Sequence, residues 1–362
     1  MHKIAFIKFC GLAASGIEKF LQNFAVLLSE NEFQIDYYYT NNCEFTDGHK
    51  HADNDGQRKI FLENSKVNLI EVDVEKRIGG RDNLPWVNSN LFDLYDEYNY
   101  DLTIFAGRGV DEYPLNNINK SKVLFSVHGD DAYKQSNIYK YLLICNWQKN
   151  RWTRNGGDLE KSKVLAPIVP VTENKNNLRE KLGLKNDTFV YGMHQANRHG
   201  LFNGMCLEAY KKIENENNFF IMLGGEDSYR RYSKELGIKN IKFIEETGIT
   251  ENIHAFLNTL NVYTHSRADG EVCSSALTEA LYHKLPILSH PAANMGHFEH
   301  IEGNGLLTAS VDEYANEMKR LETDKEYYQN ISENSCNKYK NKYNFKLLEQ
   351  KYIDLVKGII YN

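Results

Sequence analysis

The strongest constraint on the fold is a regular alternation of short apolar segments with longer amphipathic ones, which begins near the first residue. An apolar segment at residues 3–9 is followed by residues 17–28, whose apolar side chains recur at the spacing of one helical face. Further strands are predicted at residues 33–39, 67–72, 102–105 and 123–127, with helical or mixed segments such as 88–98 between them. Strands that alternate with helices predict a parallel sheet covered by helices on both faces.

The same alternation starts again after a segment that contains Pro167 and Pro170. The second series of predicted strands is 188–193, 219–223, 241–244, 261–264 and 286–289, and the predicted helices are 205–213, 229–236, 253–260 and 274–282. A chain of 362 residues is long enough for about two domains. We therefore predict an α/β protein with two Rossmann-like domains, residues 1–168 and 169–342, and a ligand cleft between them.

Composition excludes several classes of function. The net charge is −6, and the acidic and basic residues are interleaved without the basic stripe that nucleic-acid binding requires. The six cysteines are dispersed, which predicts reduced thiols and a cytoplasmic protein. Lys8 interrupts the first apolar segment, which favours a buried strand over a signal peptide. Because a bilayer-spanning helix needs about 20 apolar residues, any membrane contact is predicted to be peripheral.

The most informative stretch is residues 267–281, in which Glu271 and Glu279 are separated by seven residues. Glu271 is predicted to lie in the turn after a strand and Glu279 two turns into the next helix. The turn at residues 273–275 offers free backbone N–H groups and a positive helix terminus, both of which suit a phosphate. Glu271 would then face sugar hydroxyls, and Glu279 would accept hydrogen bonds from ribose hydroxyls. Alternatively, Glu271 favours the helix N-terminus and Glu279 lies on a solvated face.

This stretch resembles the Glu-x7-Glu signature of the family 4 retaining glycosyltransferases of the GT-B fold. Weaker similarities to the same family extend over nearly the whole chain, at residues 15–19, 194–198, 203–210, 223–225 and 284–288. The resemblance implies a retaining transfer of sugar from a nucleotide diphosphate, such as a UDP- or GDP-sugar, to a glycan, lipid-linked or other acceptor. It also implies that a C-terminal helix, residues 343–362, crosses back to the first domain.

The resemblance also implies roles for particular residues. His128 would contact the sugar near the reacting carbon, Glu271 the sugar hydroxyls and Arg198 the diphosphate. The further residues predicted to bind the donor are Gly16, His194, Asn197, Asn203, Val272, Cys273, Ser274, Ser275 and Glu279. Asp130 and Asp131 are predicted to bind the acceptor, together with loops at residues 43–58 and 76–90. Asp130 and Asp131 do not form a metal-binding Asp-x-Asp motif within an acidic cluster, and residues 108–111 are no better, so no cofactor and no obligatory metal are expected.

Two departures from the family pattern leave an alternative open. Val272, Cys273 and Ser274 replace the frequent Gly-Phe-Gly, and Asn203 replaces the usual lysine. A catalytically silent scaffold or partner subunit that keeps the sugar-nucleotide fold is therefore the second hypothesis, and His128 is then an ordinary strand-end histidine. A nicotinamide-dependent oxidoreductase is disfavoured because the Gly-x-Gly-x-x-Gly fingerprint is missing.

Overall fold

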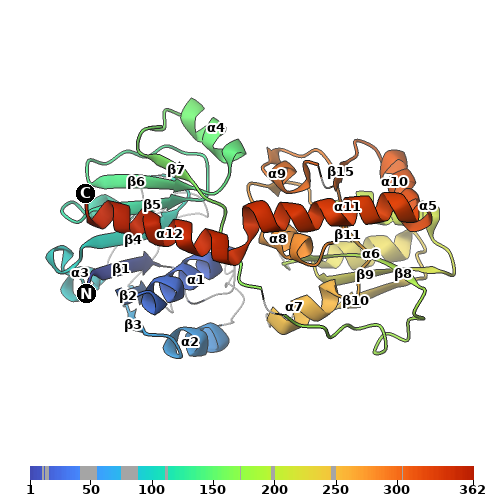
Figure 1. Ribbon diagram of the computed structural model, residues 1–362, viewed down its shortest axis with the longest axis horizontal. Coiled ribbons are helices and arrows are strands. Elements are labelled where there is room, and N and C mark those ends of the chain that lie inside the picture. Colours follow the sequence, from blue (N-terminus) through green and yellow to red (C-terminus); the bar gives the residue numbers. More distant parts are fainter. Residues whose placement is uncertain are drawn as a thin grey trace. The chain divides into compact units, whose positions relative to one another are not determined.

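The chain forms two compact units in a computed structural model (Figure 1), one made of Met1–Ile168 with Phe345–Asn362 and the other of Val169–Asn344. The structure describes residues 1–9, 12, 16–40, 55–74, 89–110, 113–171, 173–196, 200–245, 250–303 and 305–362. Within these ranges, no helix is long and apolar enough to cross a membrane.

The described part of the first unit contains a seven-stranded parallel sheet in the order β3-β2-β1-β4-β5-β6-β7. Its strands are β1 (Lys3–Lys8), β2 (Gln34–Tyr39), β3 (Val67–Glu71), β4 (Leu102–Gly107), β5 (Val123–Val127), β6 (Ile138–Leu143) and β7 (Ser162–Val164). Its helices are α1 (Gly16–Glu30), α2 (Asp55–Glu63), α3 (Leu91–Leu94), α4 (Asn146–Arg154) and α12 (Phe345–Ile360), with 3-10 turns η1 (Glu97–Asn99) and η2 (Leu115–Asn117).

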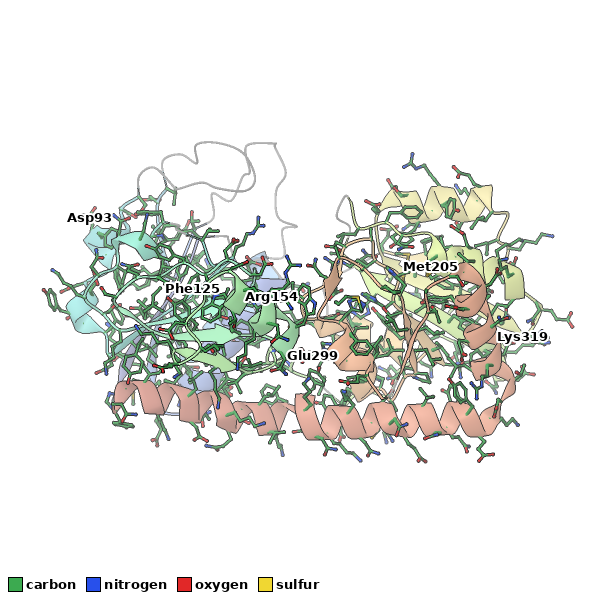
Figure 2. All side chains as sticks on the ribbon, turned by 90° about the horizontal axis from the view of Figure 1, so that it is seen from above. Asp93, Phe125, Arg154, Met205, Glu299 and Lys319 are labelled. Atoms are coloured by element: carbon green, nitrogen blue, oxygen red, sulfur yellow. The ribbon has the colours of Figure 1, made fainter. Side chains whose placement is uncertain are left out.

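Both faces of this sheet are covered, which explains why the four central residues of β1, 4–7, are all apolar instead of alternating with polar residues. Phe6 packs against Phe24 of α1, with ring centroids 5.5 Å apart, and Phe24 packs against Tyr352 of α12 at 4.9 Å. Side chains on the other face of the sheet, including Ala5 and Phe125, belong to a second buried cluster. Phe125 is labelled in Figure 2. The helix α12 is fixed to this unit because the Tyr352 hydroxyl donates to the carbonyl of Ala166 at 2.9 Å.

The described part of the second unit contains a six-stranded parallel sheet in the order β10-β9-β8-β11-β13-β15 and a separate parallel pair, β12-β14. The strands are β8 (Phe189–Gln195), β9 (Asn218–Gly224), β10 (Ile241–Ile244), β11 (Val262–Thr264), β12 (Gly270–Glu271), β13 (Ile287–Ser289), β14 (Asn294–Met295) and β15 (Gly305–Leu307). The helices are α5 (Met205–Ile213), α6 (Asp227–Glu235), α7 (Thr250–Leu257), α8 (Ser275–Tyr282), α9 (Phe298–Ile301), α10 (Val311–Thr323), α11 (Lys325–Lys338) and the π-helical turn η3 (Tyr339–Tyr343).

This second sheet is also buried between helices. Tyr191 packs against Tyr210 of α5 at 5.9 Å, and its hydroxyl donates to the carbonyl of Met318 in α10 at 2.9 Å. His194 faces the other side, where its ring contacts Phe256 of α7 at 6.0 Å. In both units the strand order reverses at one point, between β1 and β4 and between β8 and β11. At such a point the loops diverge and leave a crevice at the carboxyl ends of the strands.

The predicted fold class, two Rossmann-like α/β units with parallel sheets, is confirmed. The polar loop predicted at residues 43–58 is wrong at its end, because α2 begins at Asp55. Leu62 on this helix is buried, and Arg58 binds Gln22 and Asn23 of α1, so tertiary contacts stabilise a helix that composition alone did not indicate. The preceding residues 41–54 lie outside the described ranges.

Candidate functional site

The two signature glutamates lie on adjoining elements near the strand-order reversal of the second sheet. Glu271 belongs to β12, which pairs with β14, so the prediction that it lies in a turn is wrong. Gly270 makes this pairing possible, because it has a φ of +64° and a Cβ there would lie 2.1 Å from the carbonyl oxygen of Asn294. The chain then turns and enters α8, where Ser274 caps the helix by accepting a hydrogen bond from the N–H of Leu277 at 3.2 Å.

The carboxylate of Glu271 is held by two cationic or hydrogen-bonding partners. Its Oε1 lies 3.2 Å from Nη1 of Arg267 and 3.6 Å from Nε2 of His265. Burial by itself raises the pKa of Glu271, but the hydrogen bond from His265 and the charge of Arg267 lower it to about 2. Glu271 is therefore an ionised, oriented acceptor at neutral pH and not a proton donor.

Three histidines lie around Glu271 and Arg267, namely His265, His290 and His297, and sequence analysis identified none of them. The ring centroids of His265 and His297 lie 4.9 Å apart, and those of His265 and His290 lie 6.3 Å apart and are stacked. Nε2 of His290 accepts from the backbone N–H of Arg267 at 3.1 Å, so the ring carries its proton on Nδ1, which donates to the carbonyl of Pro291. Burial lowers the pKa of His290 and lowers that of His297 to about 4, so both rings are neutral at pH 7.

A simple signal accompanies these histidines in the sequence. His265 directly follows β11, and His290 directly follows the neighbouring strand β13. Parallel strands end at the same edge of a sheet, so two strands that each end in histidine bring both rings to one place. Recognising this required the strand order, which local patterns do not reveal.

Glu279 occupies a second polar contact in the same unit. Its side chain is 2% exposed, and Oε2 lies 3.1 Å from Nε2 of His194 in β8. Because a carboxylate only accepts hydrogen bonds, Nε2 carries the proton, and Nδ1 of His194 is buried with no partner among the described residues. The alternative that Glu279 lies on a solvated face is wrong.

The remaining predicted donor contacts fall into three groups. Val272, Cys273, Ser274 and Ser275 form the connection from β12 into α8, whose first N–H groups have no acceptor within the helix. Asn203 directly precedes Gly204, the N-cap of α5; its Oδ1 accepts from the N–H of Met205 at 2.9 Å, and its Nδ2 lies 3.3 Å from Nε2 of His290. Figure 2 labels Met205 at the start of this helix. The predictions for Asn197 and Arg198 lie outside the described residues.

In the first unit, His128 directly follows β5. Its Nε2 lies 3.0 Å from Oγ of Ser126, and its ring packs against Phe20 at 5.4 Å. Burial, together with the charge of Lys8, lowers the pKa of His128 to about 3, so the imidazole is neutral at pH 7. Lys8 itself lies 3.6 Å from Oε1 of Glu18 in α1, a buried pair that sequence analysis did not assign to a site.

The other candidates of the first unit are more exposed. Asp130 forms an ion pair with Arg151 of α4, and Asp131 is exposed. Gly16 begins α1, and no atom lies within 4 Å of the place where a Cβ would stand. Across the described residues, no three His, Cys, Asp or Glu side chains are grouped so that they could hold a metal ion. Independence from metal remains a prediction.

Two parallel sheets between helices, each with polar side chains at the strand-order reversal, define a two-domain protein of the GT-B class. Residues 174–338, nearly the whole second unit, match the family model described as glycosyl transferases group 1. The second unit therefore carries a glycosyltransferase group 1 domain, and the resemblance drawn from the sequence is confirmed at that level. Retention of configuration and the roles of the two glutamates stay predictions. A search of curated proteins finds no match.

Solved structures share the fold over the full length of the chain. HepE from Anabaena, solved with UDP-glucose, has a TM-score of 0.72 and 16% identity, and the match covers 99% of this chain and 100% of HepE. A glycosyltransferase from Rickettsia africae has a TM-score of 0.75 and 14% identity over 100% and 99%. WaaG, a glycosyltransferase involved in lipopolysaccharide biosynthesis, has a TM-score of 0.70 and 14% identity over 98% and 100%.

Proposed function

We propose that this protein is a retaining glycosyltransferase that moves a sugar from a nucleotide diphosphate, a UDP- or GDP-sugar, to a glycan, lipid-linked or other acceptor without a metal ion. The observation that carries the proposal is the state of the two signature glutamates. Glu279 is buried and Glu271 is half-buried, and each is oriented by a histidine at the carboxyl end of a different strand, His265 after β11 and His194 in β8. Fixed carboxylates at a strand-order reversal suit a ligand with hydroxyl groups.

In this proposal, each glutamate binds a different part of the donor. Glu271 accepts hydrogen bonds from sugar hydroxyls, which its ionised state and its contacts with Arg267 and His265 support. Glu279 accepts from the ribose hydroxyls, while His194 keeps its carboxylate in place. Charge-assisted hydrogen bonds of this kind are shorter and stronger than neutral ones.

The diphosphate is bound at the start of α8, with Arg198 as its cationic partner. The helix N-terminus supplies backbone N–H donors and a partial positive charge where the charge of the leaving group develops. The side chains of residues 272–274 sit where the family often has glycine. The phosphates therefore approach the backbone of this turn past small or medium-sized side chains.

Retention is proposed from the family resemblance, and the site has little chemistry of its own to supply. A nucleoside diphosphate is a good leaving group, so the protein mainly orients the donor and acceptor and stabilises charge. With a pKa of about 2, Glu271 is too weak a base to remove the acceptor proton. We propose front-side attack, in which the leaving phosphate oxygen takes this proton, and His128, a neutral imidazole, contacts the sugar near the anomeric carbon.

The structural relatives support a nucleotide-sugar donor. HepE has been solved with UDP-glucose and with UDP and glucose, and WaaG acts in lipopolysaccharide biosynthesis. A role in polysaccharide or lipopolysaccharide assembly is accordingly part of the proposal. Asp130 and Asp131 are the proposed acceptor contacts in the first unit.

The second candidate function is a catalytically silent sugar-nucleotide-binding scaffold. The observation in its favour is Asn203, which stands where the family has lysine and whose side chain already bonds to Met205 and His290. Both functions predict binding of a nucleoside diphosphate, which raises the melting temperature of the native state.

Release of the nucleotide separates the two functions. We would first screen UDP, GDP, ADP and CMP by thermal shift in the presence of a chelator. The sugar conjugates of the stabilising nucleotide are then tested for release of that nucleotide with mixed glycan acceptors. Release with the wild type and not with Glu271→Gln supports the transferase. Stabilisation without release for any conjugate favours the scaffold, and a strict need for manganese or magnesium overturns the metal-free mechanism.

A further inference from the structure

The amino ends of β5, β6 and β7 surround a hollow that the proposed function leaves without a role. The hollow has a volume of about 520 Å³, and its lining includes Lys120, Lys122, Asn137, Tyr139, Lys140 and Lys161. Lys122 and Asn137 directly precede β5 and β6, and Lys161 directly precedes β7. Parallel strands begin at the same edge of a sheet, so the topology gathers these loops at the edge opposite His128, which follows the carboxyl end of β5.

The positive charge around this hollow is not neutralised by carboxylates. Nζ of Lys122 donates to the carbonyl of Ile359 at 3.1 Å, and Nζ of Lys161 donates to that of Ile138 at 3.0 Å. Nζ of Lys140 donates to the carbonyl of Glu160 at 3.1 Å. In the described part of the chain, none of the four lysines forms an ion pair. An ammonium group has three donors, so each anchored lysine keeps donors for a ligand.

The two carboxylates nearby accept hydrogen bonds from backbone N–H groups. The carboxylate of Glu97 accepts from the backbone N–H groups of Asn119, Lys120 and Ser121, at distances from 2.5 to 3.0 Å. The carboxylate of Asp158 accepts from the backbone N–H groups of Glu160 and Lys161 at 3.1 and 3.3 Å. These hydrogen bonds hold the two carboxylates outside the hollow, whose lining among the described residues contains four lysines and no acidic side chain, so the local potential attracts an anion.

The side-chain oxygen of Asn137 needs a hydrogen-bond donor. Its Nδ2 donates to the carbonyl of Ile118 at 2.6 Å, which fixes the orientation of the amide. Its Oδ1 is buried and has no partner among the described residues. A buried carbonyl oxygen without a donor is unfavourable, and a ligand hydroxyl placed there would remove that cost. Tyr139 is 36% exposed at the same hollow, and Nζ of Lys122 lies over its ring, 5.1 Å from the centroid.

We propose that this hollow is a second binding site, for a sugar phosphate, separate from the donor site. The phosphoryl group binds the ammonium groups of Lys122, Lys140 and Lys161, and a sugar hydroxyl donates to Oδ1 of Asn137. A phosphorylated sugar fits better than a plain anion, because its separate hydroxyls can donate to the amide while all of its phosphoryl oxygens remain for the lysines.

The site is tested by calorimetric titration with glucose 6-phosphate, inorganic phosphate and glucose, all in saturating UDP so that the donor site is filled. We expect glucose 6-phosphate to bind at least about tenfold more tightly than phosphate. Lys140→Gln and Lys161→Gln keep a donor for the carbonyl but remove the charge, and each should weaken binding about tenfold. Lys163→Gln is the matched control, since Lys163 is exposed on β7 and does not line the hollow.

Stabilisation by UDP alone should be the same in all three variants, which shows that they fold and keep the donor site. Equal affinity for glucose 6-phosphate and phosphate would overturn the role of Asn137. Binding that survives in Lys140→Gln and Lys161→Gln, or that is lost equally in Lys163→Gln, would overturn the site. Vesicles of anionic phospholipid provide a further arm, and lysine-dependent binding to vesicles without binding of glucose 6-phosphate would replace the proposal with a membrane surface.

Discussion

The strand-order reversals of the two sheets carry different chemistry. In the second unit, His194 in β8 orients the carboxylate of Glu279, and His265 after β11 orients that of Glu271. In the first unit, Lys8 at the end of β1 is matched internally, with Nζ 3.6 Å from Glu18 and 3.4 Å from the carbonyl of Ala106 in β4. The same topology therefore presents oriented anionic acceptors in one unit and an internally paired charge beside a neutral histidine in the other.

This difference indicates how the two units divide recognition. A nucleotide sugar always carries a ribose, a diphosphate and a sugar, so its site can be built from fixed polar groups. The candidates of the first unit are fewer, and the loops at residues 41–54 and 75–88 lie outside the described ranges. The comparison predicts that the strongest single effects on donor chemistry come from the second unit.

The largest expected effect is that of Glu271→Gln. The change removes the charge that orients the sugar but keeps the size of the side chain, so transfer should fall about 100-fold or more while UDP binding stays nearly constant. Turnover and calorimetric affinity for UDP measure the two effects. Asp269→Asn is the matched control, because Asp269 also pairs with Arg267 and has no proposed sugar contact. Unchanged turnover in Glu271→Gln would remove the main support for the proposed function.

Glu279→Ala should have the next largest effect, and this effect should be on binding of the ribose. Loss of charge-assisted hydrogen bonds to the ribose should weaken UDP binding about 10- to 100-fold. The variant should bind UDP and 2′-deoxy-UDP equally, whereas the wild type should prefer UDP. His194→Ala, which frees the carboxylate to rotate, should reduce this preference only in part. A preference for UDP that persists in Glu279→Ala would place the ribose elsewhere.

The sequence predicted this division in outline because both signature glutamates lie within one local stretch. The spacing of Glu271 and Glu279, the apolar strands and the break at Pro167 and Pro170 are all local features, and the parallel fold class follows from their order. Local patterns also located the helix that carries Glu279, since residues 274–282 were predicted and α8 spans Ser275–Tyr282.

The surroundings of Glu271 were not predictable in this way. His265, His290 and His297 lie on separate segments and meet only because β11 and β13 are neighbours. The charge state of Glu271 likewise depends on Arg267, which the sequence places in the same stretch without indicating its contact. Strands β6 and β7 were missed as well. The polar residues in β6, with sequence IYKYLL, weaken the apolar pattern, and β7 has only three residues.

Arg267→Met tests whether the electrostatics of the second unit matter for turnover. Arg267 lowers the pKa of Glu271, and burial raises it, so removing the cation moves that pKa upward from about 2. The wild type should show no acid limb from Glu271 above about pH 4, whereas the variant should lose transfer as the pH falls through about 4 to 6, with about a tenfold loss at neutral pH. Arg230→Met is the control, since Arg230 pairs with the exposed Glu245. If the wild type and Arg267→Met gave the same pH profile of kcat/KM, Arg267 would have no part in the transfer reaction.

The smallest expected effects are those of substitutions at Asn203. Asn203→Lys removes the acceptor for the N–H of Met205, the first residue of α5, which costs about 1 kcal/mol and should lower the melting temperature by about 2–4 °C. It also adds a cation at the position where the family has lysine, so UDP should bind up to about tenfold more tightly. Asn203→Asp separates the two effects, because aspartate keeps an acceptor for the N–H of Met205 but adds a negative charge. This variant should keep its melting temperature and bind UDP more weakly. If both variants bind UDP as the wild type does, then Asn203 acts only as the acceptor for the N–H of Met205, and the donor diphosphate lies away from this end of β8.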